Sequence, residues 1–183
     1  MSDPDQNLIQ QFRETGQQRF LEELLQRHLA SIRNLAFQML LDHNAADDVT
    51  QEIFVRVIRG IDRFEGRSAF STWLMAVAMN AIRSERQKLG RSRLQFHADL
   101  PEPSTTILAS PDGGVLQKEL TSEIQAALAE LKPQFRAAIV LVCLQGLPAA
   151  DAATMEGCSA DTMYWRVHEA RKQLKKLLAE HLQ

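Results

Sequence analysis

The chain has 183 residues, of which 45% are apolar and 24% are charged, and its formal net charge is −2. This is the composition of an ordinary globular protein with room for one large domain or two small ones. The longest apolar run, 137–144, is far shorter than the roughly 20 residues of a membrane span. We therefore expect no membrane insertion. Because the acidic N-terminus lacks the layout of a signal peptide, we expect a cytoplasmic protein.

Charge is unevenly distributed along the chain. Residues 1–82 carry 8 basic and 11 acidic side chains and sum to −3, whereas 83–93 and 166–176 each sum to +4. Phosphate neutralisation supplies most non-specific DNA binding, so two small basic zones on an acidic body predict weak DNA affinity for the free chain. We expect a larger partner to bring it to DNA. The alternative is that each zone is only a solvated helix face.

Apolar residues at helical spacing predict three helices in the first half of the chain. The first carries Phe20, Leu24, Ile32, Leu35 and Met39. The second is expected to open at Asp47-Asp48, where carboxylates suit the helix dipole. Its apolar side comprises Val49, Ile53, Phe54, Val57, Ile58 and Ile61. The third follows a turn at 64–68, ends near Lys88, and carries Phe70, Trp73, Leu74, Val77, Ala81 and Ile82, of which Phe70 and Trp73 are expected in the core.

The helical pattern lapses at 90–114, where prolines, glycines and hydroxyl residues are typical of a linker. It resumes with an apolar stripe of Leu116, Leu120, Ile124, Leu128 and Leu131. A further helix is expected from Pro133 to Gln145, with Gly146 as its left-handed stop.

The last part of the chain has the spacing of a helix-turn-helix. Ala153 is small enough for a close helix crossing, Gly157 suits a positive-φ turn, and Met163 can be buried early in the second helix. Ser159 is a plausible N-cap of that helix, and Pro148 can start the preceding one. The expected inward stripe is Met163, Val167, Ala170, Leu174 and Leu177. We therefore predict an all-α protein with two small helical domains, 1–89 and 115–183, joined by a flexible linker over 90–114.

These segments, in this order, resemble the extracytoplasmic-function sigma factors of bacterial RNA polymerase over almost the whole chain. The segment 47–54 (DDVTQEIF) resembles the core-binding helix of that family, and 64–74 (FEGRSAFSTWL) with 78–80 (AMN) resembles its promoter-melting and −10-reading segment. The segment 131–136 (LKPQFR), the segment 144–147 (LQGL) and the helix-turn-helix resemble its −35-reading domain.

The resemblance implies a role for three groups of residues. Core polymerase would be bound by one helix face, comprising Asp48, Gln51, Glu52, Val55 and Arg59. The −10 element would be bound by Phe64, Ser68, Asn80, Arg83, Ser84, Arg86 and Lys88. The −35 element would be bound by Arg136, Thr162, Tyr164, Trp165, Arg166, His168, Glu169, Arg171 and Lys172.

Four of these residues depart from the family pattern. Ser84 replaces an acid or amide, and Tyr164, Trp165 and Glu169 replace basic or small residues. Glu169 can accept from cytosine N4 but repels a phosphate. An unusual −35 sequence, or a weak contribution from this domain, is therefore expected. The exposed tryptophan could instead contact an inhibitor or polymerase.

The expected partners are promoter DNA, the clamp coiled coil and flap of core RNA polymerase, and an anti-sigma factor. One alternative is a helix-turn-helix regulator, or a polymerase-bound adaptor, that does not itself initiate transcription. An enzyme is disfavoured because the chain lacks H-E-x-x-H, a phosphate loop and Cys-x-x-Cys. Cys143 and Cys158 have no metal spacing and are expected to be small buried thiols. No catalytic residue, cofactor or metal is predicted.

Overall fold

The computed structural model describes the backbone of residues 4–95 and 115–181 and the side chains of 4–89 and 123–179. These residues fall into two compact units, within Met1–Phe96 and His97–Gln183, which we call the N-terminal and C-terminal units. Every regular element in the described parts is helical, which confirms the all-α prediction.

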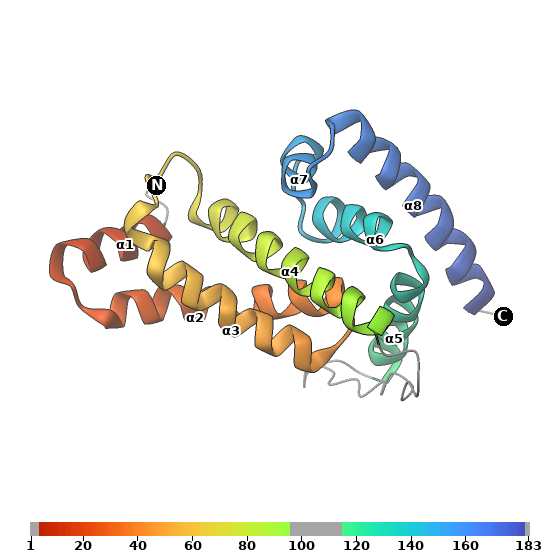
Figure 1. Cartoon of the computed structure of the whole chain (residues 1–183), viewed down its shortest axis with the longest axis horizontal. Coiled ribbons are helices and arrows are strands. Elements are labelled where there is room, and N and C mark those ends of the chain that lie inside the picture. The colour runs from red at the N-terminus through yellow and green to blue at the C-terminus, as the bar shows by residue number, and fades with distance from the viewer. Residues whose placement is uncertain (1–3, 96–114, 182–183) are drawn as a thin grey trace. The chain divides into compact units, whose positions relative to one another are not determined.

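The N-terminal unit contains α1 (Pro4–Thr15), α2 (Gln18–Leu40), α3 (His43–Gly60), the 3-10 turn η1 (Ile61–Arg63) and α4 (Phe70–Gln95). Helix α2 packs against α1, α3 and α4, and α3 also packs against α4 (Figure 1). The buried faces follow the predicted helical stripes. Ile58 is an exception, because it lies on the solvent side of α3 although it was expected on the apolar side.

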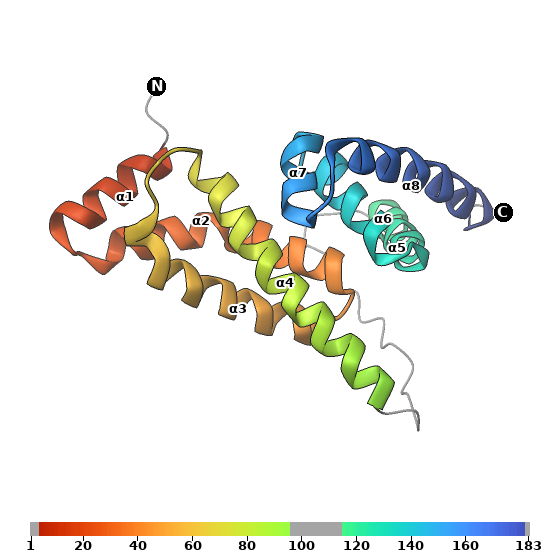
Figure 2. The ribbon, with the colours of Figure 1, turned by 45° about the horizontal axis from the view of Figure 1, so that its top comes forward.

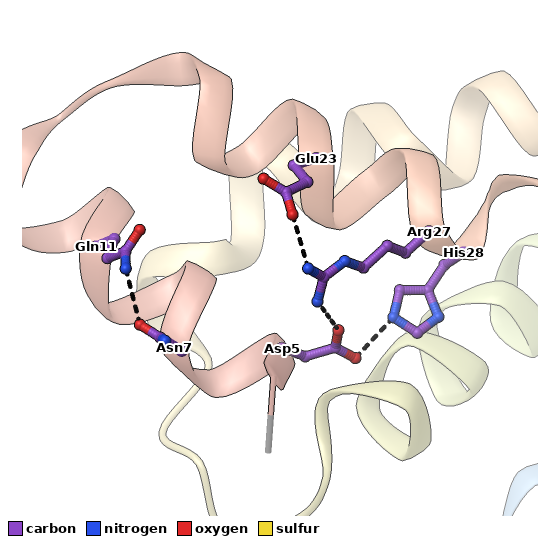
Figure 3. Close-up of polar contacts among 6 residues, drawn as sticks. All are labelled: Asp5, Asn7, Gln11, Glu23, Arg27 and His28. Atoms are coloured by element: carbon purple, nitrogen blue, oxygen red, sulfur yellow. Dashed lines mark hydrogen bonds and ion pairs between the residues drawn. The ribbon is translucent and has the colours of Figure 1, made fainter. Parts of the chain in front are cut away.

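Helix α1 has no counterpart among the predicted helices. Pro4 starts it, Asp5 lies in its first turn, and only Leu8 and Ile9 are buried. Leu8, Ile9 and Phe12 span little more than one turn, which is too short a stripe to predict a helix. Figure 3 shows Asp5 bridging to α2, where it pairs with Arg27 at 3.6 Å and with His28 Nε2 at 2.7 Å.

Helix α3 begins earlier than predicted. Asp42 is its N-cap and accepts a hydrogen bond from the Ala45 backbone N–H at 2.9 Å. The expectation that Asp47 and Asp48 open this helix is therefore wrong. Asp47 pairs with Arg33 of α2, whose guanidinium donates to both carboxylate oxygens at 2.5 and 3.0 Å. This hydrogen bond holds the pKa of Asp47 below its ordinary value.

Helix α4 runs to Gln95 and passes the expected end near Lys88, so the first six residues of the predicted linker are helical. Gly90 weakens a helix by only about 1 kcal/mol. No proline follows before Pro101, so nothing in 90–95 ends the helix. The rest of the predicted linker, 96–114, lies outside the described residues.

The C-terminal unit contains α5 (Val115–Glu130), α6 (Pro133–Ala138), the π-helical turn η2 (Ile139–Leu144), α7 (Ala149–Glu156) and α8 (Ala160–His181). Helix α8 packs against α5, α6 and α7, as Figure 2 shows for α6 and α7. The single helix predicted for 133–145 therefore changes to π pitch at Ile139, and the Gln145 N–H bonds the Val140 carbonyl five residues back. Ile124 was expected in the buried stripe but is exposed, while Ala127 beside it is buried.

The helix-turn-helix is formed by α7 and α8. Ala153 and Met163 are buried where the helices meet, and Gly157 has φ +65°. Ser159 Oγ accepts from the Thr162 N–H at 3.2 Å, which confirms the predicted N-cap. The predicted fold of this segment is confirmed, although Pro148 stands just before α7 rather than in its first turn.

Gly157 offers a test of this turn. A side chain in the left-handed region costs about 1–2 kcal/mol, so Gly157→Ala should lower the free energy of unfolding by that amount. The control is Gly60→Ala, because Gly60 has φ −106° and a Cβ there makes an ordinary 3.6 Å contact with Trp73. Urea unfolding followed by circular dichroism measures both. Equal stability of Gly157→Ala and the wild type would contradict the role of the turn.

Candidate nucleic-acid interface

The outward face of α3 combines apolar and charged groups. Val55 and Ile58, one helical turn apart, have 43% and 46% of their surface exposed. Asp48, Gln51 and Arg59 are exposed around them. Of the predicted core-binding residues, only Glu52 is half-buried, and it accepts from Arg56 at 2.5 Å. An apolar centre with a charged rim is the pattern of a protein-binding surface. Ile58 belongs to it, although the sequence pattern placed it inside.

The loop after α3 is exposed from Glu65 to Ala69, and Ser68 lies within it. Phe64 stands at its start and is only 4% exposed. Its ring packs edge-on against Phe70 at 5.7 Å and lies 5.4 Å from that of Trp73. The structure thus places Phe64 beneath the loop in the core, whereas its predicted contact with a flipped base requires an accessible ring.

Arg13 of α1, which is distant in sequence, contacts the backbone where this loop begins. Its guanidinium donates to the Ile61 carbonyl at 3.0 Å and to the Phe64 carbonyl. The two carbonyls belong to the first residue of η1 and to the residue that follows this turn. A charged donor that binds both fixes the point where the loop leaves the core. Sequence reasoning missed this contact, because 48 residues separate Arg13 from Ile61 and no local motif links them.

The predicted −10 residues of α4 lie along the middle of that helix, between Asn80 and Lys88. Asn80 is exposed, and Ser84 Oγ donates to the backbone carbonyl of Asn80 at 2.9 Å. Arg83 and Arg86 are half-buried. The exposed Lys88 donates to Glu85 at 2.9 Å, and this hydrogen bond raises the pKa of Lys88. Lys88 therefore remains cationic while its field is partly offset by Glu85.

The side chains of Arg91 and Arg93 lie outside the described part of the first basic zone. The described members of that zone are thus the cations at 83, 86 and 88. They follow Asn80 along α4, so a base-edge donor and acceptor precedes groups able to contact phosphates.

Helix α8 exposes the residues expected to face DNA. Tyr164 and Trp165 are 64% and 57% exposed, and His168 and Lys172 are also exposed. Thr162 is half-buried, with its hydroxyl 2.8 Å from that of Ser159. The outward placement predicted from helical spacing therefore holds for the start of this helix.

Charged residues of α8 have partners within the chain. Arg166 donates to Cys158 Sγ at 3.6 Å, and Arg171 donates to Cys143 Sγ at 3.3 Å. Glu169 accepts from Gln173 at 2.9 Å. Cys143 is exposed and Cys158 is half-buried, so the expectation of two buried thiols is wrong. The π turn carries the Cys143 side chain outward, to where it meets Arg171.

Arg136 is the predicted −35 residue that the structure places differently. Its guanidinium donates to the carbonyls of Leu128, Ala129 and Leu131 at 2.8, 2.9 and 3.2 Å. These carbonyls lie at or just beyond the C-terminus of α5, where backbone acceptors lack helical partners. The position of Arg136 is therefore that of a helix cap.

No group of three or more histidine, cysteine or acidic side chains among the described residues is placed to hold a metal ion. No helix in the same part of the chain is long and apolar enough to span a bilayer.

Comparison with known proteins assigns a family to each unit. Residues 24–92 match the model of Sigma-70 region 2, and residues 121–174 match that of Sigma-70, region 4. The chain is 37% identical over 153 residues to the ECF RNA polymerase sigma factor EcfG of Rhodopseudomonas palustris, with 82% of each chain covered. It is 31% identical over 163 residues to the ECF RNA polymerase sigma factor SigE of Mycolicibacterium smegmatis, covering 87% of this chain and 62% of SigE.

A similar fold occurs in the sigma factor RpoE of Bartonella quintana, solved in complex with the anti-sigma factor NepR. The TM-score is 0.74 at 29% identity, and the match covers 89% of this chain and 98% of that one. The resemblance therefore extends over both units.

The position of Arg136 leads to a test of its role. Arg136→Ala removes a charged donor from three carbonyls and should lower the free energy of unfolding by about 2 kcal/mol. Lys132→Ala, which removes an exposed cation four residues earlier, should change it little. Urea titration of both variants at neutral pH gives the comparison. If Arg136→Ala is as stable as the wild type but loses −35 binding, the arginine acts on DNA.

Proposed function

The chain belongs to the extracytoplasmic-function sigma factors, and from this premise we propose that it binds core RNA polymerase and directs transcription initiation at specific promoters. The N-terminal unit binds core and captures the non-template strand of the −10 element. The C-terminal unit binds the −35 duplex and the polymerase flap. The activity is one of binding, and it is exercised in the cytoplasm, where polymerase and DNA are found.

The observation that carries this proposal is the presence of two kinds of surface on different helices of the N-terminal unit. Val55 and Ile58 of α3 form an apolar centre suited to a protein, whereas Asn80 and the following cations lie on α4. One unit can thus hold polymerase on one helix and unpaired DNA on another. The acidic charge of residues 1–82 disfavours DNA binding by the free chain.

Base capture in the −10 element is assigned to the loop of 65–69 and to Asn80. Ser68 and Asn80 are exposed and carry donors and acceptors for a base edge. Arg83, Arg86 and Lys88 contact the sugar–phosphate backbone. Phe64 and Arg13 support the loop from within the unit.

An anti-sigma factor is the proposed regulator. The similar RpoE of Bartonella quintana was solved bound to the anti-sigma factor NepR, and the exposed apolar centre of α3 is a surface that such a protein can cover. A regulator that covers Val55 and Ile58 excludes core polymerase from the same face.

Core binding tests the first half of the proposal. Val55→Asp and Ile58→Asp each place a carboxylate in the apolar centre, and each should weaken core binding by about 1–3 kcal/mol, or roughly 5- to 150-fold. The control is Leu29→Asp, because Leu29 of α2 is 38% exposed and lies outside the proposed surface. Co-purification with core, followed by run-off transcription without ATP hydrolysis, measures the outcome. Loss of binding in the control with none in the α3 variants would refute the assignment.

Promoter opening tests the role of Asn80. Asn80→Ala removes a base-edge donor and acceptor, and should slow opening roughly tenfold while core binding remains. Gln87→Ala removes another exposed amide from α4 and should open promoters like the wild type. Permanganate reactivity of −10 thymines reports opening, and co-purification reports core binding. An equal loss of both in Asn80→Ala would argue against base reading.

A further inference from the structure

Trp165 is a large apolar side chain on the outward face of the second helix of the helix-turn-helix. It shares that face with Asp161, His168 and Lys172, at spacings of four, three and four residues, and all four are exposed. The opposite face, with Met163 and Val167 among its members, is buried. In a helix-turn-helix, the N-terminal residues of this helix contact base edges in the major groove. Trp165 therefore lies where bases are read.

The indole is supported from below. Its ring centroid lies 5.7 Å from that of Phe135 at a tilt of 59°. Phe135 is itself buried in a cluster with Leu128, Leu131, Ile139 and Ala170. Support on one side restricts the indole before DNA arrives, so less rotamer freedom is lost on binding. The other side remains exposed.

The chemistry of the indole selects a base. Its ring surface is apolar, and its only polar group is one N–H donor. The only apolar group that a base pair presents in the major groove is the 5-methyl of thymine. Burying that methyl group against an aromatic face is favourable. A cytosine amino group, or a base carbonyl without a hydrogen-bond donor, would lose its water in the same place, which is unfavourable.

The surrounding charges favour DNA over a protein as the occupant of this face. Lys172 and Lys175 are exposed further along α8 and can contact phosphates as the helix enters the groove. The Glu169 carboxylate, which repels phosphates, is drawn along the helix axis by its hydrogen bond from Gln173. The face thus combines an apolar side chain with the cations Lys172 and Lys175, and with one acid, Asp161, at its start.

We propose that Trp165 determines −35 specificity by contacting the 5-methyl group of a thymine. This inference rests on the proposed function, because it names the base feature that the C-terminal unit reads. It also accounts for a large exposed aromatic side chain on the outward face of α8. The −35 preference of this protein thus includes a thymine opposite Trp165.

Removal of a single methyl group tests this inference. Holoenzyme made from core polymerase and the full chain first selects promoters from a library randomised over the −35 element. Each thymine in the selected element is then replaced by deoxyuridine, which lacks only the 5-methyl group. At one position the wild-type holoenzyme should bind the thymine promoter about fourfold more tightly than the uracil promoter, as for one buried methyl group.

Two variants test whether Trp165 is the cause of the thymine-to-uracil binding ratio. In Trp165→Ala the thymine-to-uracil ratio should fall to about one. In Tyr164→Ala, which removes the neighbouring exposed aromatic, the fourfold ratio should persist whatever its effect on total affinity. Core binding and helicity confirm that each variant is folded. The deoxyuridine comparison uses the wild-type protein, so it tests the methyl contact even if a variant fails to fold.

A selected −35 element without thymine, or equal methyl sensitivity in the wild type and Trp165→Ala, overturns the inference. An unchanged ratio together with weakened binding of core or anti-sigma factor by Trp165→Ala assigns the residue to a protein contact instead. A holoenzyme that selects and transcribes no promoter refutes the proposed function itself, and the thymine contact with it.

Discussion

The packing of α3 against α2 and α4 is the constraint on which the proposed activity of the N-terminal unit depends. A helix buries only one stripe, and in α3 that stripe includes Val49, Ile53 and Val57. Burial of these residues turns Val55 and Ile58 toward solvent, so the core of the unit and its apolar binding centre are set by the same helix orientation. Near the start of α3, Asp47 pairs with Arg33 of α2 and adds a polar link to this packing.

The same packing anchors the loop that follows α3. Phe64 continues the buried side of the helix into an aromatic cluster with Phe70 and Trp73, and Arg13 fixes the carbonyls at the loop entrance. The residues from Glu65 to Ala69 can therefore be exposed while both ends of the loop are held. The base capture proposed for this loop needs this combination, because a fully mobile loop loses more conformational entropy on binding than an anchored one.

In the C-terminal unit, local interactions orient the helix that is proposed to contact double-stranded DNA. The Ser159 cap, the left-handed Gly157 and the buried Met163 determine where α8 begins and which side it shows. Side-chain contacts then orient individual residues of the proposed DNA-reading surface on that side. Phe135 supports Trp165, and Cys143 accepts from Arg171. The aromatic partner comes from α6 and the thiol partner from η2, so the proposed reading surface depends on helices outside the helix-turn-helix.

The sequence by itself determined the all-α fold, the helix-turn-helix and the family, because helical spacing, a cap and a positive-φ glycine act over a few neighbouring residues. Only the tertiary structure decided that Arg136 caps α5, that Arg13 reaches Phe64, and that Ile58 faces solvent. Helical period specifies the direction of an apolar face but not its width, so residues at its edge, such as Ile58, are decided by the neighbouring helix. Capping and clamping arginines bind backbone carbonyls, which every residue carries, and so no residue pattern marks their partners.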